Sequence, residues 1–131
     1  MTVTGPGHAT VMTGTDPLRH GIVGNSWLDR KTGASVYCVD PKSGTGHLRV
    51  PTIGDALVDA TRGRARVFSV GGKDRSTMLC AGKKGTAYYY DRPKGQFVRW
   101  PAGHAKWKYD AKRTGPSEDA LVLDFAEELI Q

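Results

Sequence analysis

The sequence predicts an α/β domain with a short mixed sheet, flanking helices and two β-hairpins. An apolar, β-branched run at 65–70 stands between two segments of helical pattern, the order expected of a parallel strand and its connecting helices. Two pairs of strand-like segments are each joined by a short turn that contains glycine. A chain of 131 residues is long enough for one core, so we expect a single domain over 1–131.

The first expected element is a short helix over 5–13, GPGHATVMT. Thr4 stands where an N-cap residue would, Pro6 lies in the first turn, and Gly14 ends the pattern. A helix that begins there directs unpaired backbone N–H groups at whatever lies beside Thr4.

The two hairpins have similar signals. The first joins 26–30 to 34–39 through 31–33, and the second joins 86–91 to 96–100 through 92–95. The second contains three consecutive tyrosines, Tyr88, Tyr89 and Tyr90, which could stack nucleobases. Side-chain alternation along a half-buried strand explains them more simply. Residues 41–50, between the first hairpin and the next helix, are rich in loop-forming residues.

The central segment predicts a strand between two helices. Thr52 and Asp55 resemble a capping box, with Asp in place of the commoner Glu, at the start of a helix over 52–62. The run at 65–70 predicts a buried parallel strand, and a glycine pair then turns the chain into a helix over 73–81. A strand, a glycine turn and a helix commonly build an anion site.

The end of the chain predicts a loop and then an amphipathic helix. Residues 101–116 are polar and basic and have no clear period, which is typical of a loop or linker. Ser117 is placed to cap the helix that follows it. The apolar stripe of that helix is Leu121, Phe125 and Leu129.

The net charge of +6 is unevenly distributed. Residues 1–60 hold five basic and five acidic side chains, 61–115 hold fourteen and three, and 116–131 hold none and five, so the three segments carry 0, +11 and −5. A basic middle segment attracts phosphate esters, nucleic acid or acidic surfaces. The simpler alternative is a solvated face, partly offset by the acidic C-terminus.

Several classes of protein and site are disfavoured. No apolar stretch approaches the roughly 18–20 residues of a membrane span, and no secretory signal opens the sequence, so no compartment is predicted. Cys38 and Cys80 form no motif; a disulfide, a metal ligand or two buried thiols are possible, and buried thiols are favoured.

The sequence contains no zinc-finger spacing and no HExxH, P-loop or GxSxG motif, and its histidines are dispersed, so only the fold could gather them into a metal site. A structural role is the commoner one for a lone histidine. Lys73 and Arg75, two positions apart after the glycine pair, are a more specific indication of a binding site. A point cation and a planar donor suit phosphoryl oxygens, although on spacing alone an exposed charged turn explains them.

A family resemblance rests on three strings: TVTGPGHATVMTGTDPLRHGIVGNSWLDRKTGASVYCVD, VPTIGDALVDA and FSVGGKDRSTMLCAGKKG. Together they resemble the alkaline phosphatase superfamily, in its type I phosphodiesterase and nucleotide pyrophosphatase branch, which includes the phosphate-irrepressible alkaline phosphatases. The resemblance runs from residue 2 to about residue 100 and resumes at SEDALVLDFAEELI. It implies an alkaline-phosphatase-like core.

The resemblance also assigns roles to four residues. Thr4 is similar to the family's nucleophile, Asn25 to the side chain that donates to a phosphoryl oxygen, and Lys73 with Arg75 to the pair that contacts the transferred phosphoryl group. A threonine hydroxyl needs activation by a metal or a base, and the other three side chains would stabilise charge on the nonbridging oxygens.

The departure from the family pattern is equally informative. Full-length members are several times longer, are usually periplasmic or extracellular, and hold two zinc ions through segments that this sequence does not contain. We therefore expect a truncated or internally deleted relative without the inherited bimetallic site. Any zinc would be recruited by new ligands such as His8, His20, His104 or Cys38, including ligands from another subunit.

The function expected from these observations is hydrolysis of a small phosphate ester. Without two zinc ions, activated phosphotriesters or phosphodiesters are favoured over highly charged monoesters. The alternatives are a noncatalytic binder of anions or, less favoured, of nucleic acid, and an inactive remnant. Because a truncated sheet exposes edges, we expect a homo-oligomer, with the C-terminal helix as the first candidate interface.

Overall fold

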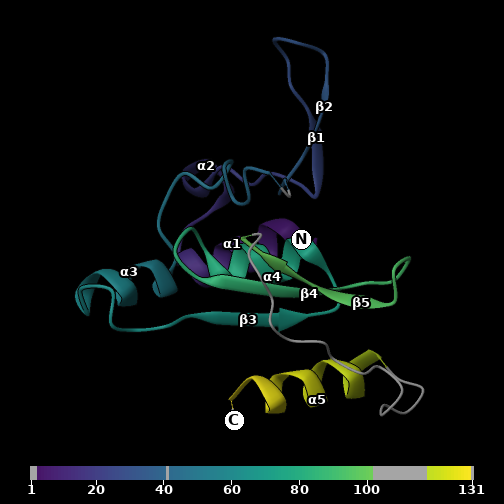
Figure 1. Cartoon of the computed structure of the whole chain (residues 1–131). Coiled ribbons are helices and arrows are strands. Elements are labelled where there is room, and N and C mark those ends of the chain that lie inside the picture. The colour runs from purple at the N-terminus through teal and green to yellow at the C-terminus, as the bar shows by residue number, and fades with distance from the viewer. Residues whose placement is uncertain (1–2, 41, 102–117, 131) are drawn as a thin grey trace.

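The computed structural model describes residues 3–40, 42–101 and 118–130. Its central sheet has the order β3-β4-β5, with β3 (Phe68–Gly71) parallel to β4 (Thr86–Asp91) and β4 antiparallel to β5 (Gln96–Trp100). Helix α4 (Asp74–Ala81) packs on one face with α1 (Thr4–Thr13) against it, and α5 (Glu118–Ile130) lies along the other face (Figure 1). The prediction of an α/β class with a mixed sheet is confirmed.

Both hairpins are confirmed. The first consists of β1 (Ser26–Leu28) and β2 (Ser35–Tyr37), which pair in antiparallel register and project away from the sheet (Figure 1). Gly33 adopts a positive φ of 69° in its turn, a conformation that glycine adopts without strain. The second hairpin is β4 with β5, whose register pairs Tyr89 with Val98.

One short helix was not predicted. Residues Pro17–His20 form α2, which Asp16 caps by accepting a hydrogen bond from the Arg19 N–H. Gly21 ends it in the left-handed region, with φ 83°. The start and stop signals stand in the sequence, but four residues are too few to show a helical period.

Helix α3 (Ile53–Ala60) has the predicted capping box. Thr52 Oγ1 accepts from the Asp55 N–H at 3.1 Å, and Asp55 Oδ2 accepts from the Thr52 N–H at 2.9 Å. The other carboxylate oxygen of Asp55 accepts from the N–H groups of Lys83 and Lys84, both at 2.8 Å. The same carboxylate therefore caps α3 and fastens it to the turn between α4 and β4.

The predicted strand 65–70 begins three residues later and ends one residue later than expected, and it is not buried. It is parallel to β4, as predicted, but it spans Phe68–Gly71, and Phe68 is 47% exposed. The expectation of a buried strand was wrong, because β3 pairs with β4 alone among the described residues and so lacks a neighbouring strand on its other side.

The C-terminal helix forms as predicted, although Ser117, its predicted cap, and the segment 102–117 lie outside the described residues. Leu121 and Phe125 of its stripe are buried, and the Phe125 ring stacks on Phe97 of β5 at a centroid distance of 4.0 Å. These two side chains pack against the helix's own sheet, while Leu123 and Ile130 of the same helix are 63% and 85% exposed, and the expectation that this helix is an interface stays a prediction.

The tyrosines of β4 follow the alternation predicted for a half-buried strand. Tyr88 contacts Phe125 at 5.2 Å and Tyr90 contacts Phe97 at 5.4 Å, so both rings lie on the α5 face. Tyr89 instead packs against the core on the α4 face. The aromatic partners of Tyr88 and Tyr90 favour this simple explanation over a stack for nucleobases.

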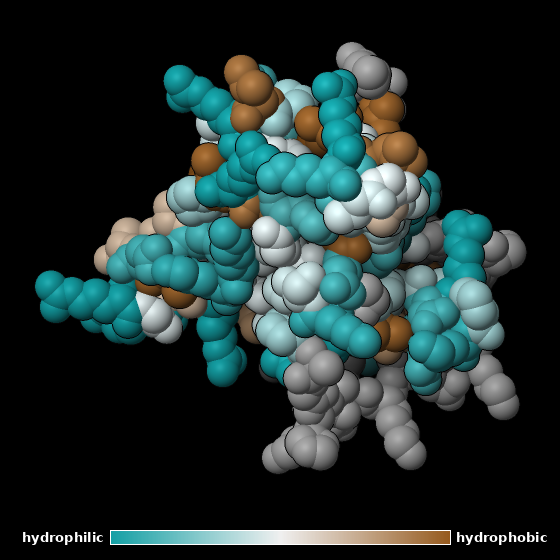
Figure 2. All heavy atoms as spheres, turned by 90° about the horizontal axis from the view of Figure 1, so that it is seen from above, coloured by the Kyte–Doolittle hydropathy of each residue, from teal (hydrophilic) through white to brown (hydrophobic). Residues whose placement is uncertain are grey.

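The core lies between the sheet, α4 and α1. Its buried members form one cluster: Ala9, Ile22, Cys38, Val39, Leu48, Met78, Leu79, Ala81 and Ala87. On the face shown in Figure 2, exposed apolar side chains lie in small separate patches among hydrophilic ones. No helix in the described part of the chain is long and apolar enough to span a membrane.

Candidate phosphoryl-binding site

The start of α1 is capped from a distance. Val3 is the N-cap residue, Thr4 is the first helical residue, and no side-chain cap comes from the helix itself. Asn25, just before β1, supplies the missing acceptor, since its Oδ1 accepts from the Gly5 N–H at 2.7 Å. The expectation that Thr4 is the N-cap was therefore wrong, because a side chain from another segment occupies that role.

This arrangement leaves a hydroxyl and an amino group without hydrogen-bond partners among the described residues at the start of α1. Because Oδ1 of Asn25 already accepts a hydrogen bond, the Nδ2 amino group of the same amide is available as a donor. The Thr4 hydroxyl makes no hydrogen bond with any described residue, whereas the Thr4 carbonyl accepts from His8 Nδ1 at 2.8 Å. A hydroxyl and an amide donor at the positive end of a helix dipole suit an oxyanion.

Cys38 closes the inner side of this site. A Cβ built on Gly5 would lie 3.2 Å from Cys38 Sγ and 3.1 Å from Asn25 Oδ1, so the backbone of α1 approaches both closely. Burial raises the pKa of the Cys38 thiol to about 11, with a smaller contribution from the charge of Asp74. The thiol is therefore protonated near neutral pH and is a weak nucleophile.

Arg75, in the first turn of α4, is positioned by two residues. Its Nη1 donates to the Tyr37 hydroxyl at 3.0 Å, and that hydroxyl donates to Asp74 Oδ1 at 2.9 Å. The same carboxylate oxygen accepts from the Arg75 N–H at 2.7 Å. The hydrogen bond to Tyr37 raises the pKa of the guanidinium further, so Arg75 is a permanent cation.

One donor of Arg75 is still unused. Its Nε is buried and has no hydrogen-bond partner among the described residues. A buried donor without an acceptor costs free energy, about 1–3 kcal/mol. A phosphoryl oxygen is the acceptor that an arginine matches best, because the guanidinium can bind it through two parallel hydrogen bonds.

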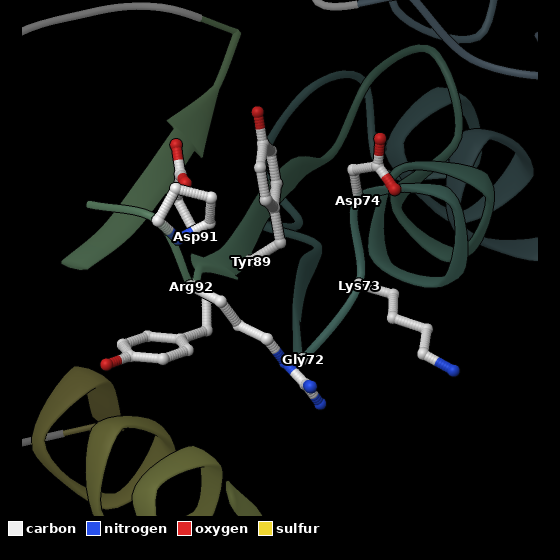
Figure 3. A pocket seen from close by; sticks show the side chains of 8 residues that line it. Gly72, Lys73, Asp74, Tyr89, Asp91 and Arg92 are labelled. Carbon is white, nitrogen blue, oxygen red and sulfur yellow. The ribbon is translucent and has the colours of Figure 1, made fainter. Parts of the chain in front are cut away.

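The side chain of Lys73 extends away from the Asp74 carboxylate (Figure 3). Lys73 is the N-cap residue of α4 and is exposed. Figure 3 shows the Asp74 carboxylate and the Tyr89 hydroxyl pointing to one side, while the side chains of Lys73 and Arg92 extend to the other. These residues line a pocket of about 370 Å³, formed by residues 72–74 and 89–93.

Of the four predicted site residues, the structure brings Thr4 and Asn25 together, while Arg75 lies on α4 and Lys73 is the N-cap residue of that helix. Thr4 and Asn25 share the start of α1, which Cys38 also approaches, and the charge of Arg75 makes a small contribution that lowers the pKa of Cys38. Lys73 points away from the Asp74 carboxylate to which Arg75 is tied.

The proposed metal ligands do not assemble in the described part of the chain. His20 is buried with both ring nitrogens engaged: Nδ1 accepts from the Ile22 N–H at 3.1 Å, and Nε2 bonds Thr10 Oγ1 at 3.1 Å. His104 lies outside the described residues. No group of three or more His, Cys, Asp or Glu side chains that could hold a metal lies among those described, so His8 and Cys38 do not complete a zinc site there.

Comparison with known proteins identifies the family. Residues 1–126 match the sequence profile of the type I phosphodiesterase / nucleotide pyrophosphatase family. The chain belongs to this family. The resemblance predicted from its sequence strings is confirmed.

Two relatives of this phosphodiesterase-family chain show how much of the fold it contains. Alkaline phosphatase PhoV of Synechococcus elongatus is 38% identical over 111 residues, which are 74% of this chain and 20% of PhoV. Alkaline phosphatase PafA of Elizabethkingia meningoseptica is 38% identical over 112 residues, with the same shares of 74% and 20%. The chain spans about a fifth of the length of these relatives.

Solved structures of PafA confirm the alkaline-phosphatase-like fold. The wild-type structure matches with a TM-score of 0.75 at 29% identity, over 96% of this chain and 25% of PafA. A second structure, with a TM-score of 0.74 at 26% identity, carries substitutions of one threonine, one asparagine, one lysine and one arginine. The substituted threonine and asparagine are separated by the same number of positions as Thr4 and Asn25. The substituted lysine and arginine are likewise separated by the same number of positions as Lys73 and Arg75.

Two residues that contact Arg75 were missed from the sequence. Asp74 stands between Lys73 and Arg75, and an acid in the first turn of a helix is a recognisable signal. Tyr37 has no such signal, because it lies 38 residues from the arginine that it binds.

Proposed function

We propose that this chain is a phosphoester hydrolase acting on activated phosphotriesters or phosphodiesters. Thr4 would be the nucleophile, and the Asn25 amide and the Arg75 guanidinium would bind the nonbridging oxygens. The observation that carries the proposal is the Asn25–Gly5 hydrogen bond, which caps α1 without Thr4 and brings the Asn25 amide to the residue next to Thr4. The interval match with the residues substituted in PafA supports the same set.

The proposed step forms a bond between Thr4 Oγ1 and phosphorus. The bond to the leaving alcohol breaks, the hydroxyl proton passes to base in the solvent, and water then releases the phosphoryl group from Thr4. Because the described residues offer no zinc ligand set, no step is assigned to a metal. Esters with good leaving groups and little charge demand the least of such a site.

Arg75 has the clearer electrostatic role. The hydrogen bond that Arg75 Nη1 donates to the Tyr37 hydroxyl, which itself donates to Asp74, holds the Arg75 side chain in one orientation, so little entropy is lost when it binds an oxyanion. Its unpartnered Nε would gain an acceptor when the phosphoryl group arrives. Charge on the nonbridging oxygens is then balanced by a fixed cation.

The test is hydrolysis of p-nitrophenyl phosphotriester, diester and monoester by the purified chain, with and without a chelator. We expect Thr4→Val to lower the turnover of the triester and diester at least 100-fold, and Arg75→Gln to lower it about 10- to 100-fold. Arg64→Gln is the matched control, because this exposed arginine bonds only a backbone carbonyl near α3. Unchanged turnover in Thr4→Val would remove the proposal.

A further inference from the structure

The pocket beside Lys73 lies where α/β sheets bind ligands. It stands just outside the C-terminal ends of the parallel strands β3 and β4, whose last residues include the paired Gly71 and Tyr89. In open α/β sheets this is the usual position of a ligand crevice. A volume of about 370 Å³ is at the lower end for small-molecule sites, which suits a group of about one ring.

The two carboxylates that line the pocket already have partners. Asp91 accepts from the Lys94 backbone N–H at 3.4 Å and pairs with Lys94 Nζ at 2.8 Å. Asp74 is committed to Tyr37 and to the Arg75 N–H. Neither carboxylate is therefore left to bind Lys73, whose ammonium has no ion-pair partner among the described residues.

Tyr89 supplies an aromatic wall. Unlike Tyr88 and Tyr90, its ring has no aromatic partner in the part of the chain that the structure describes. Its lower part packs against the core, which fixes the ring, and the rest lines the pocket. A fixed ring with a cation nearby favours a planar aromatic ligand, through ring–ring contact and through attraction between the cation and the ligand's π face.

The pocket adjoins the phosphoryl-binding site through Asp74. This residue lines the pocket and also accepts the hydrogen bond from Tyr37 that positions Arg75. Tyr89 lines the same pocket, and Figure 3 shows its hydroxyl pointing to the same side as the Asp74 carboxylate. A group bonded to a phosphorus at Arg75 can therefore extend past Asp74 toward Tyr89.

We propose that this pocket binds the planar aromatic group of the ester, with Tyr89 contacting its face and Lys73 setting the preference for its charge. The inference rests on the proposed function, because it assigns the part of the substrate beyond the phosphoryl group. Lys73 is then a specificity residue, separate from Arg75, and favours an aromatic group that carries negative charge.

The experiment measures binding rather than turnover. Phenylphosphonate and methylphosphonate are titrated into the chain and followed by NMR chemical shifts, in the wild type and in Tyr89→Leu, Tyr89→Phe, Lys73→Gln and Lys83→Gln. The phenyl compound is expected to bind about three- to tenfold more tightly than the methyl compound. Tyr89→Leu should abolish this difference without weakening methylphosphonate, and Tyr89→Phe should retain it.

Lys73 is tested with a charged ring. 4-Carboxyphenylphosphonate should bind more tightly than phenylphosphonate to the wild type, and Lys73→Gln should remove that gain. Lys83→Gln makes the same charge change at an exposed position beyond the other end of α4 and should have no effect. Equal binding of the phenyl and methyl compounds would overturn the pocket and leave the proposed function standing. Binding of neither compound would count against both.

Discussion

Asn25 Oδ1 accepts a hydrogen bond from the Gly5 N–H over 2.7 Å, so a side chain 20 residues away caps the first helix. N-caps usually come from the residue next to the helix. Here the remote cap couples the loop before β1 to the position of Thr4. The same amide thus has one oxygen that stabilises the fold and one amino group that faces the site.

These two roles of Asn25 can be separated. Asn25→Ala removes both and should lower the free energy of unfolding by about 1–3 kcal/mol, because the Gly5 N–H loses its acceptor. Asn25→Asp keeps the acceptor, and a carboxylate is favourable at a helix N-terminus, so stability should be retained. Its second oxygen replaces the amide donor and repels phosphonate, so we expect at least tenfold weaker methylphosphonate binding.

Urea unfolding and the phosphonate titration check this pair of variants. If Asn25→Asp bound methylphosphonate as tightly as the wild type, the amino group would have no part in oxyanion binding.

Tyr37→Phe tests the positioning of Arg75. The variant removes the hydroxyl that accepts from Arg75 Nη1 and donates to Asp74. We expect methylphosphonate affinity to fall about three- to tenfold while the free energy of unfolding changes by about 1 kcal/mol. Tyr88→Phe is the matched control, because that ring packs against Phe125 on the opposite face of the sheet. Equal losses in both variants would show that the hydroxyl does not position Arg75.

Asp55 should be among the most destabilising positions to truncate. Its carboxylate is 2% exposed and accepts hydrogen bonds from three backbone N–H groups, those of Thr52, Lys83 and Lys84. Asp55→Ala leaves these donors without acceptors, so we expect a loss of about 3–5 kcal/mol. Asp59→Ala removes only an exposed ion pair with Lys84 and should cost less than about 1 kcal/mol. Chemical denaturation of both variants measures the contrast.

Because of His20, the free energy of unfolding should decrease as the pH is lowered. Burial lowers its pKa from 6.5, with a smaller opposing effect from Asp16. The folded state therefore binds a proton less readily than the unfolded state, and stability is full above pH 6.5 and falls as the pH is lowered through that value. Protonation would also turn Nδ1 into a donor facing the Ile22 N–H.

The measurement is the free energy of unfolding between pH 8 and pH 5 for the wild type and for His20→Gln. The variant should be less stable at pH 8, because it loses a buried side chain with two hydrogen bonds, and its dependence on pH in this range should be flatter. Parallel curves for the two proteins would exclude His20 as the source.

How far the sequence predicted this structure depends on how local each signal is. The capping box of Thr52 and Asp55, the glycine turns of the hairpins and the amphipathic period of α5 all lie within a few residues, and each was confirmed. The contacts that build the site join Gly5 to Asn25 and Tyr37 to Arg75, and no local pattern encodes them. The resemblance supplied the site residues, but not the residues that hold them.

We further propose that the chain forms a homo-oligomer through the open edge of β3. Among the described residues β3 pairs with β4 only, so its other edge presents unpaired backbone groups beside the half-exposed Phe68. An edge of this kind is a template for pairing with a second copy, and a two-fold contact between identical edges is self-complementary. The edge of β3 is favoured over the C-terminal helix, because Leu121 and Phe125 of the helix stripe are buried against its own sheet.

Size-exclusion chromatography with light scattering at micromolar concentration checks the assembly. The wild type should have at least the mass of a dimer, and Phe68→Lys should shift it to the monomer, because a charged side chain at a strand edge disfavours pairing. Leu18→Lys is the matched control: this leucine of α2 is 86% exposed, and α2 is not part of the sheet. A wild type that is monomeric at this concentration would contradict the proposal, and dissociation by both variants alike would move the interface away from β3.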